Sequence, residues 1–461
     1  MMDAPEIEKI LSIALRRGGD FADIFIEKKK GTGITLEAQR IEKIHSGIDF
    51  GAGVRIISGG RTSYAYTNDV TFQSLSKIAN SLSKAVETGE GSVINLQYRE
   101  PEYQFEIIRP PDEIPVEKKV RLLEKANKAA RGYDSRIKQT TVGYGDAEQE
   151  ITVANSEGLH IQGRRIRCRM VVNVVSHGEG LIQTGSESAG AFSGFELFSS
   201  QIDVGELAET AASRSVLMLE ARPAPAGTMV VVMSGEAGGT MVHEACGHGL
   251  EADLVQKKLS VYAGKKGEKV ASNMVTVIDD ATIPNRYGSY PFDDEGTTGE
   301  KTVLIEKGIL KNYMYDWLTA HRDGTKSTGN GRRESYQYVP IPRMTNTYIA
   351  PGEYDPKEII SSVPKGLFVK KMGGGQVNTT NGDFVFEVTE GYLIENGKIT
   401  APVRGATLTG NGPKVLQLID MVGNDQGWAI GTCGKEGQGV PVGDAQPTIR
   451  IPEMVVGGVL D

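Results

Sequence analysis

Helical and strand-like hydrophobic spacings alternate along the first half of the chain. Residues 4–17 place apolar side chains at helical spacing, and short strand-like runs follow between residues 21 and 67. The next predicted elements, in order, are helices at 72–87 and 116–131, strands between 136 and 177, and a helix at 203–221. The order helix, strands, helices, strands, helix predicts an α+β fold, because a repeated βαβ unit would alternate single strands with single helices.

One predicted strand carries an unusual charge pattern. From Arg165 to Arg169, arginine alternates strictly with isoleucine or cysteine. Successive side chains of a strand point to opposite faces of its sheet. The three arginines are therefore expected on one polar face, while the other face packs inward.

A Pro- and Gly-rich segment at residues 221–227 is typical of a linker. At 461 residues the chain exceeds one average domain. We therefore predict an N-terminal α/β-type domain at 1–221 and a mainly antiparallel β domain at 228–461. The second domain opens with a buried strand at 228–233 and a helix at about 240–255. Strands are then predicted at 270–278, 302–306, 309–315, 367–370, 383–394, 398–403 and 446–451, with a helix at 413–422.

Composition and charge exclude several classes of protein. The net charge of −8 gives a nucleic-acid partner no electrostatic support. No apolar run is long enough to span a membrane, and residues 1–20 lack the apolar core of a signal peptide. The three cysteines are too sparse for a disulfide framework and suit a reducing compartment. A cytoplasmic protein is expected.

The strongest chemical signal is the stretch from His243 to His248, which reads His-Glu-Ala-Cys-Gly-His. Imidazole is a common zinc ligand, and a glutamate beside a ligand histidine is well placed to accept a proton from water held by the metal. Glu251 and Asp253 follow within two turns and could support the ligands. This motif favours a metal-dependent hydrolase, although two ordinary helix histidines would give the same spacing.

The spacing of the two histidines makes a structural demand. They are five residues apart, so in a regular α-helix they would point about 140° from each other and could not share one metal. A π-bulge inserts one extra residue and brings them to the same side. Gly247 makes that distortion easier, so we predict an irregular turn at Ala245–Gly247.

Cys433, in a Gly-rich stretch, is a candidate third ligand. Two histidines and one cysteine, with a fourth position left open, are compatible with a catalytic zinc site. Taken alone, a cysteine is more often a small buried apolar side chain. A catalytic thiolate with a histidine base is a third interpretation, but it leaves Glu244 and the second histidine without a role.

Several ordered stretches together carry a family resemblance. They are the motif through Glu251, Gly329-Asn330-Gly331-Arg332-Arg333, Pro342-Arg343-Met344-Thr345-Asn346-Thr347, Gly405-Ala406-Thr407-Leu408, Met421-Val422-Gly423-Asn424-Asp425, and Cys433-Gly434-Lys435-Glu436-Gly437-Gln438. With these the chain resembles the TldD/PmbA family, and within it the TldD branch, which carries the His-Glu-x-x-x-His motif.

The resemblance implies a cytoplasmic metalloprotease that acts on unfolded or flexible peptides with little sequence preference. It implies that His243, His248 and Cys433 bind Zn²⁺ or another divalent metal, and that Glu244 is the catalytic glutamate. It also implies a dimer, either of two identical chains or with a PmbA (TldE)-type subunit, and an extended substrate added beside a sheet edge. The alternative is a non-catalytic peptide-binding or partner subunit, which the intact motif disfavours.

Two further groups of residues are candidates for contact with substrate. An oxyanion donor is expected among Arg332, Arg333, Arg343 and Asn346, or among backbone N–H groups of residues 373–375 and 431–434. A structural role is the alternative for each of these arginines. The acidic loop at 290–297 is expected to face a peptide's N-terminal ammonium group or to line the cleft, and a solvated turn is the alternative.

Overall fold

The computed structural model describes residues 2–86, 91 and 93–458. The N-terminal part is built on one sheet of seven strands in the order β3-β2-β1-β5-β6-β4, with β7 also pairing with β6. Its strands are β1 (Phe21–Glu37), β2 (Arg40–Ser58), β3 (Arg61–Thr67), β4 (Gln97–Arg99), β5 (Ile137–Asn155), β6 (Leu159–Gly178) and β7 (Leu181–Ala191). Several runs predicted as separate short strands are therefore single long ones.

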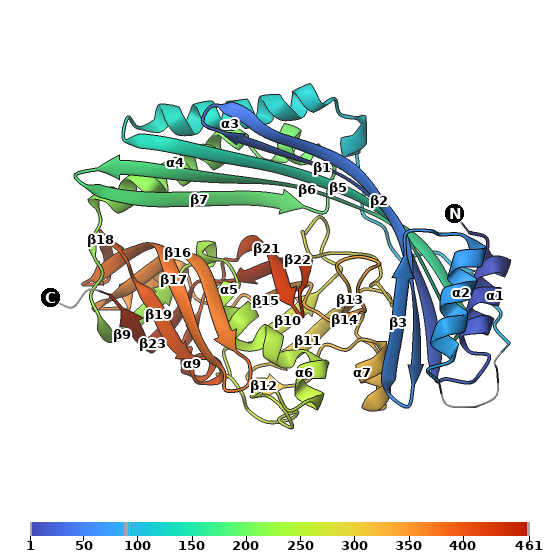
Figure 1. The fold of residues 1–461 in the computed structure, drawn as a ribbon. Helices are drawn as coiled ribbons and strands as arrows, with labels where there is room; N and C mark the ends of the chain where they lie inside the picture. Colours follow the sequence, from blue (N-terminus) through green and yellow to red (C-terminus); the bar gives the residue numbers. More distant parts are fainter. Residues whose placement is uncertain (1, 87–90, 92, 459–461) are drawn as a thin grey trace.

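Helices cover the outer side of this sheet. They are α1 (Ala4–Ala14), α2 (Phe72–Ser83), α3 (Val116–Tyr133) and α4 (Val204–Glu220). Figure 1 shows α3 and α4 on the face turned away from the C-terminal part, and α1 and α2 together at the far end of the sheet. The apolar stripes of these helices meet the apolar side of the strands, which forms two separate clusters of buried side chains. The predicted end of the second helix, Glu87, lies outside the described residues.

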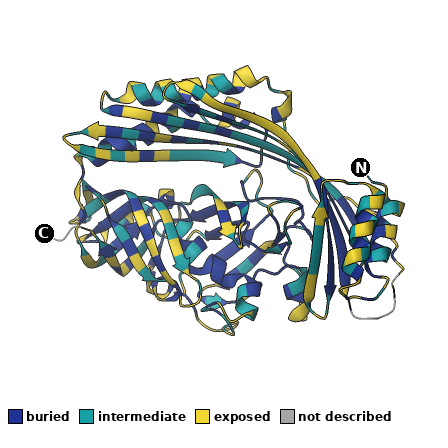
Figure 2. Ribbon diagram, in the orientation of Figure 1, coloured by how far each residue is buried: buried dark blue, intermediate teal, exposed yellow. Residues whose placement is uncertain are grey.

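The C-terminal part contains a mixed sheet of eight strands. Its members are β8 (Arg222–Pro223), β9 (Gly227–Met233), β16 (Lys365–Asn378), β17 (Asp383–Glu395), β18 (Lys398–Arg404), β19 (Thr407–Asn411), β20 (Met421–Val422) and β23 (Ile449–Gly457). Since β16 pairs with both β9 and β17, five strands close into a ring around the largest apolar cluster. Figure 2 shows buried and exposed positions alternating along these strands, as expected where one face of a strand packs inward.

A second sheet lies beside this ring and contains the strand that carries Cys433. It has six strands in the order β12-β11-β10-β15-β22-β21, and only β15 and β22 are parallel. Its strands are β10 (Val277–Asp280), β11 (Lys301–Glu306), β12 (Ile309–Leu310), β15 (Asn346–Ile349), β21 (Gly427–Lys435) and β22 (Gln438–Gln446). Two further strands, β13 (Gly331–Arg332) and β14 (Ile341–Pro342), pair separately. The α+β class and the mainly antiparallel C-terminal part are confirmed.

Short helices complete the C-terminal part. They are α5 (Thr240–Val242), α6 (Ala252–Gln256), α7 (Trp317–Arg322), α8 (Pro356–Ser361) and α9 (Gly412–Leu418). Capping boxes begin α7 at Asp316 and α8 at Asp355, two helices that hydrophobic spacing alone does not predict. In the described part of the chain, no helix has both the length and the apolar character needed to cross a membrane.

The acidic loop at 290–297 ties the N-terminal sheet to the C-terminal part. Glu295 accepts a hydrogen bond from Arg55 at 2.7 Å, and Arg55 also pairs with Asp23 on the neighbouring strand. Asp294 accepts from Arg165 of β6 at 2.6 Å. All these groups are buried. The expectation of a solvated turn is therefore wrong, because arginines from the N-terminal sheet supply the charge partners that buried carboxylates require.

Candidate metal centre

The motif residues form an irregular helical segment with three kinds of turn. α5 ends at Val242, a π-helical turn covers His243–Gly247, and a 3₁₀ turn covers His248–Leu250. The irregular turn predicted from the histidine spacing is present. The continuous helix predicted over 240–255 is not, because chain direction changes at Glu251 before α6 begins.

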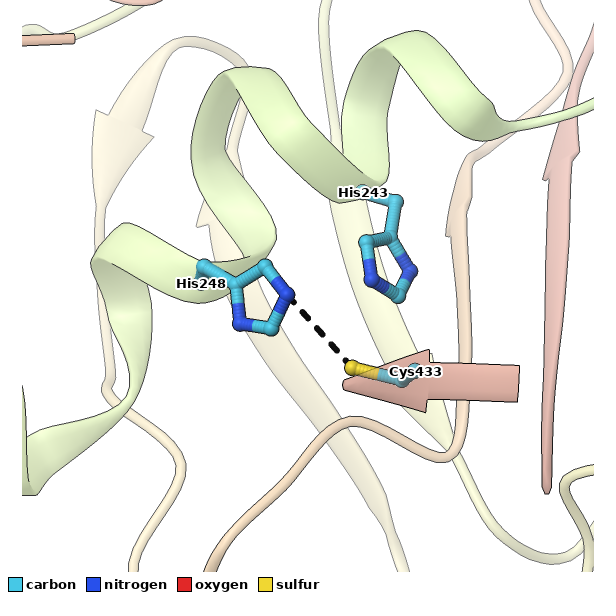
Figure 3. A group of neighbouring side chains, drawn as sticks. All are labelled: His243, His248 and Cys433. Atoms are coloured by element: carbon cyan, nitrogen blue, oxygen red, sulfur yellow. Dashed lines mark hydrogen bonds between the residues drawn. The ribbon is translucent and has the colours of Figure 1, made fainter. Parts of the chain in front are cut away.

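The wide turn brings the two imidazoles together. Their ring centroids lie 4.9 Å apart and the rings are nearly perpendicular, at 84°. Cys433 reaches them from β21, and its Sγ lies 3.4 Å from His248 Nε2 (Figure 3). One potential ligand atom from each of the three residues lies within 4.8 Å of the others. The three predicted ligands therefore converge from segments nearly 190 residues apart in sequence.

Carboxylates orient both imidazoles. Asp444 Oδ1 lies 2.8 Å from His243 Nδ1, and Glu251 Oε2 lies 3.0 Å from His248 Nδ1. With each Nδ1 bonded to a carboxylate, each Nε2 is left to face the space between the rings and the thiol. Carboxylate–histidine pairs of this kind fix the tautomer and strengthen the imidazole as a ligand. Lys435 stabilises Glu251 in turn, with Nζ 3.1 Å from its Oε2.

Electrostatics favour a thiolate at Cys433. Burial opposes ionisation, but hydrogen bonds and charge interactions with His243 and His248 lower the pKa of its thiol to about 5. Burial disfavours the charged form of His248, but interactions with the Glu251 carboxylate and with Cys433 outweigh burial and raise the pKa of that imidazole to about 9. A nitrogen, nitrogen and sulfur donor set, with a thiol inclined to ionise, fits a zinc ion.

Glu244 lines the same cavity as the three donors. Its side chain is half-buried, and burial raises the pKa of its carboxyl above the usual range, although the two imidazoles act in the opposite direction. The cavity measures about 710 Å³ and is also lined by Gly373, Gly374, Gly375, Gly431 and Gly434. A carboxylate beside a metal-type donor set in an open, glycine-walled cavity is suited to proton transfer on a bound chain.

None of the described residues that line this cavity is one of the four polar residues considered as oxyanion donors. Arg332 donates to the carbonyls of Met344 and Pro441, and Arg333 to the carbonyl of Asp294. Both side chains are buried, so these hydrogen bonds hold the two arginines against the segments that contain the carbonyls.

Arg343 and Asn346 are fully buried. Arg343 donates to the carbonyls of Cys433 and Gln438, so it supports the ligand strand from behind. Asn346 donates to the carbonyl of Asp280 at 2.7 Å. Neither residue lines the cavity, and these contacts agree with the structural role that was the alternative for the arginines. The backbone candidates at 373–375 and 431–434 do line the cavity.

Sequence reasoning missed Asp444, the partner of His243. One signal was available, because Asp444 is the only charged residue between Glu436 and Arg450. A single carboxylate in an apolar and glycine-rich strand requires a buried partner.

Replacing Asp444 by asparagine is expected to weaken metal binding by about 10–100-fold, because the neutral amide still accepts a hydrogen bond but loses the negative charge that strengthens the imidazole of His243 as a ligand. Competition with a coloured chelator measures the affinity. Glu436→Gln, at the exposed tip of the same hairpin, is the matched control and should leave the affinity unchanged. Equal affinities for Asp444→Asn and the parent chain would contradict this role of the Asp444 charge.

Gly412 packs directly on the wide turn. A Cβ at this position would lie 2.2 Å from the carbonyl oxygen of Ala245, too close for any side chain. Gly412→Ala is therefore expected to lower the free energy of unfolding by about 1–3 kcal/mol, as over-packing does elsewhere. Denaturant titration measures the change. Gly434→Ala, where an added Cβ meets nothing within 4 Å, should lose far less; equal losses would show that the contact at Ala245 is not the cause.

The fold and the cluster together define an α+β protein with a candidate metal centre of the hydrolase type. Family models give the same result. The PmbA/TldA metallopeptidase C-terminal domain matches residues 226–458, the central domain matches 109–219 and domain 1 matches 22–89. The chain belongs to the PmbA/TldD metallopeptidase family.

Curated relatives extend over nearly the whole chain. The metalloprotease TldD homolog of Haemophilus influenzae is 38% identical, over 97% of this chain and 95% of that protein. A metalloprotease of Methanocaldococcus jannaschii is 38% identical over 98% and 99%. A protein of Saccharolobus solfataricus, named a zinc metalloprotease TldD homolog, is 27% identical over 98% and 99%.

The fold also matches a solved structure. TldE from Thermococcus kodakarensis superposes with a TM-score of 0.78 and 21% identity, covering 98% of this chain and 100% of that one. At this identity the similarity concerns the fold alone.

Proposed function

We propose that this chain is a zinc-dependent metallopeptidase that cleaves unfolded or flexible peptides with little sequence preference. The observation that carries the proposal is the convergence of His243, His248 and Cys433 within 4.8 Å, in a cavity that Glu244 also lines. His243 and His248 would hold the zinc through Nε2, and Cys433 through Sγ. When bound, the ion would supply Lewis acidity that polarises the scissile carbonyl and makes a water molecule more acidic.

Glu244 is the proposed proton carrier. Its carboxylate takes a proton from the attacking water and delivers it to the nitrogen of the leaving amine. Burial, which raises its pKa, makes the carboxylate a better base than a solvated glutamate. Backbone N–H groups of the glycine segments in the cavity wall are the proposed donors to the developing oxyanion.

Substrate binding is proposed at the edge of the six-stranded sheet. β21 is the last strand in the order of this sheet, so one of its edges is unpaired in the described part of the chain. Cys433 lies on this strand, and the cavity wall runs along it from Ala429 to Lys435. A peptide added as a further strand binds through its main chain, which makes recognition indifferent to most side chains.

The active assembly is proposed to be a dimer, formed with a second copy or with a PmbA (TldE)-type subunit. A non-catalytic role fits poorly, because such a role would not need an intact set of donors with carboxylate-oriented imidazoles and an adjacent Glu244.

Metal content and cleavage of casein, measured together on the purified full chain, test the proposal. The assay is run with zinc, with chelator, and with a PmbA-type subunit added. We expect bound zinc in a near-equimolar amount and cleavage that chelator abolishes, by the chain alone or with the added subunit. A zinc-loaded chain that cleaves nothing in either setting would overturn the proposed activity.

A further inference from the structure

A second cavity, of about 930 Å³, lies between the N-terminal sheet and the C-terminal part. Strands β1, β2, β5 and β6 provide one wall. The other wall comes from Tyr287, residues 332–334 and the β21–β22 hairpin. Thr432 lines both this cavity and the one that contains Glu244, so the two are neighbours across a single strand.

Several glycines line the sheet side of this cavity. Gly33 of β1 lies opposite Gly145 of β5 in the strand pairing, and Gly31 and Gly143 line the cavity beside them. At Gly143 an added Cβ would meet nothing within 4 Å. The lack of a side chain at Gly143 leaves part of the cavity open. A larger side chain at this position would occupy that space without an immediate backbone clash.

Arginines dominate the charge of the cavity. Arg165, Arg167 and Arg169 occupy alternate positions on β6, so they share one face, and all three line the cavity. Arg332 and Arg333 approach from the opposite wall. The arginine alternation seen in the sequence thus faces an internal space, in a chain whose overall charge is −8.

Three of these arginines have no carboxylate partner in the described part of the chain. Arg167 donates to the carbonyls of Tyr287 and Ser289, both at 2.8 Å, and Arg332 also donates to carbonyls. Within the described residues, Arg167, Arg332 and Arg169 form no ion pair with a carboxylate. Burial and the neighbouring arginines lower the pKa of Arg167 to about 9.

Four carboxylates line the cavity, against five arginines and Lys29. Asp294 pairs with Arg165 at 2.6 Å, and Asp146 pairs with Lys119 at 2.6 Å, outside the cavity. Asp49 accepts a hydrogen bond from the hydroxyl of Tyr336, and Glu334 accepts one from the backbone N–H of Gly439. Positive charge without a nearby counter-charge is costly where water is partly excluded, and an anion bound in the cavity would supply that counter-charge.

We propose that this arginine-lined cavity binds a carboxylate of the peptide substrate, either its C-terminal carboxylate or an aspartate or glutamate side chain. This inference rests on the proposed peptidase function. Guanidinium groups bind carboxylates through paired hydrogen bonds. Because Thr432 separates the two cavities, an anchored carboxylate would hold the adjoining stretch of peptide along β21 near Glu244. The site thus adds a charge preference to main-chain recognition.

Binding of labelled peptides to the full-length, zinc-loaded Glu244→Gln variant tests the inference, with fluorescence anisotropy as the readout. Three peptides share one flexible sequence: a neutral one with a C-terminal amide, one with a free C-terminus, and one with a C-terminal amide and an internal glutamate in place of glutamine. At least one anionic peptide should bind about 10-fold more tightly than the neutral one. The member of the pair that gains affinity identifies the source of the carboxylate.

Two variants remove the preference by different means. Arg169→Gln removes an exposed arginine of the cavity, and Gly143→Leu fills the space without changing its charge. Both should reduce the preference to about 3-fold or less, and in the otherwise unaltered enzyme both should raise KM for the anionic peptide with kcat unchanged. Arg164→Gln, on the opposite face of β6, is the matched control and should keep the full preference.

Equal affinity for all three peptides would overturn the inference. A preference that survives both Arg169→Gln and Gly143→Leu would also overturn it, since the anion would then bind elsewhere. Failure of the proposed peptidase function is a separate result, because it would appear as absence of casein cleavage by the unaltered chain while the binding comparison remained intact.

Discussion

Glu244→Gln is expected to reduce kcat for casein or a fluorogenic peptide by about 10²–10⁴-fold, the usual contribution of a general base and acid. Glutamine has nearly the same shape but cannot take up the proton of the attacking water. The three ligand side chains remain, and so do the carboxylates that orient the two imidazoles, because Asp444 bonds to His243 and Glu251 to His248. The variant should therefore bind zinc in the same amount as the unaltered chain.

Retained metal together with lost turnover would separate a role of Glu244 in proton transfer from a role in metal binding. Metal content by mass spectrometry and steady-state kinetics are measured on the same preparation. Glu236→Gln, which removes an exposed carboxylate shortly before the motif, is the matched control and should keep full activity. A Glu244→Gln variant with normal zinc and normal kcat would remove Glu244 from the mechanism.

Local patterns in the sequence predicted much of the geometry of the candidate metal centre. The spacing of His243 and His248 required a wide turn if they were to share a metal, and the π-helical turn meets that requirement. Glu251 was a candidate supporting carboxylate, and it does bond His248. These features lie within ten residues of one another, where helical geometry alone restricts the possible arrangements.

Features that depend on distant pairing were harder to predict. The stretch around Cys433 resembles a turn because of its glycines, yet it is strand β21, held by complete pairing with β22. Two of the short strand-like runs predicted between residues 21 and 67 are parts of the single strand β1. The middle residues of β1 pair with a neighbouring strand on each side, although many of their side chains are polar. Cross-strand partners override local propensity in such segments.

Buried charge was the least predictable feature. The acidic loop and the arginines at 332, 333 and 343 resemble solvated or substrate-facing groups in sequence, but most of their partners are backbone carbonyls or charges from other elements. Arg165 is an example, since its partner Asp294 is 129 residues away. Pairing at that separation leaves no local periodicity to detect.

Cys433→Ala is expected to leave the chain nearly free of zinc and without measurable peptidase activity. The substitution removes one of three protein donors, and it removes the one whose negative charge, favoured by a pKa of about 5, attracts the cation. The remaining pair of imidazoles would bind the ion weakly. Glu244 would then lack a water molecule made more acidic by the metal. Metal content after dialysis against a weak chelator and casein cleavage measure both consequences.

Cys246→Ala is the matched control, because it also removes one buried thiol, from within the motif itself. Cys246 belongs to the apolar core and donates to the carbonyl of Val242, so the variant should keep zinc and activity. Cobalt substitution gives an independent readout, since a cysteine thiolate bound to Co²⁺ produces a near-ultraviolet charge-transfer band. That band should be present in the unaltered chain and in Cys246→Ala and absent in Cys433→Ala. If Cys433→Ala instead kept zinc but lost activity, the thiol would act on the substrate, and the nucleophile interpretation would replace the ligand role.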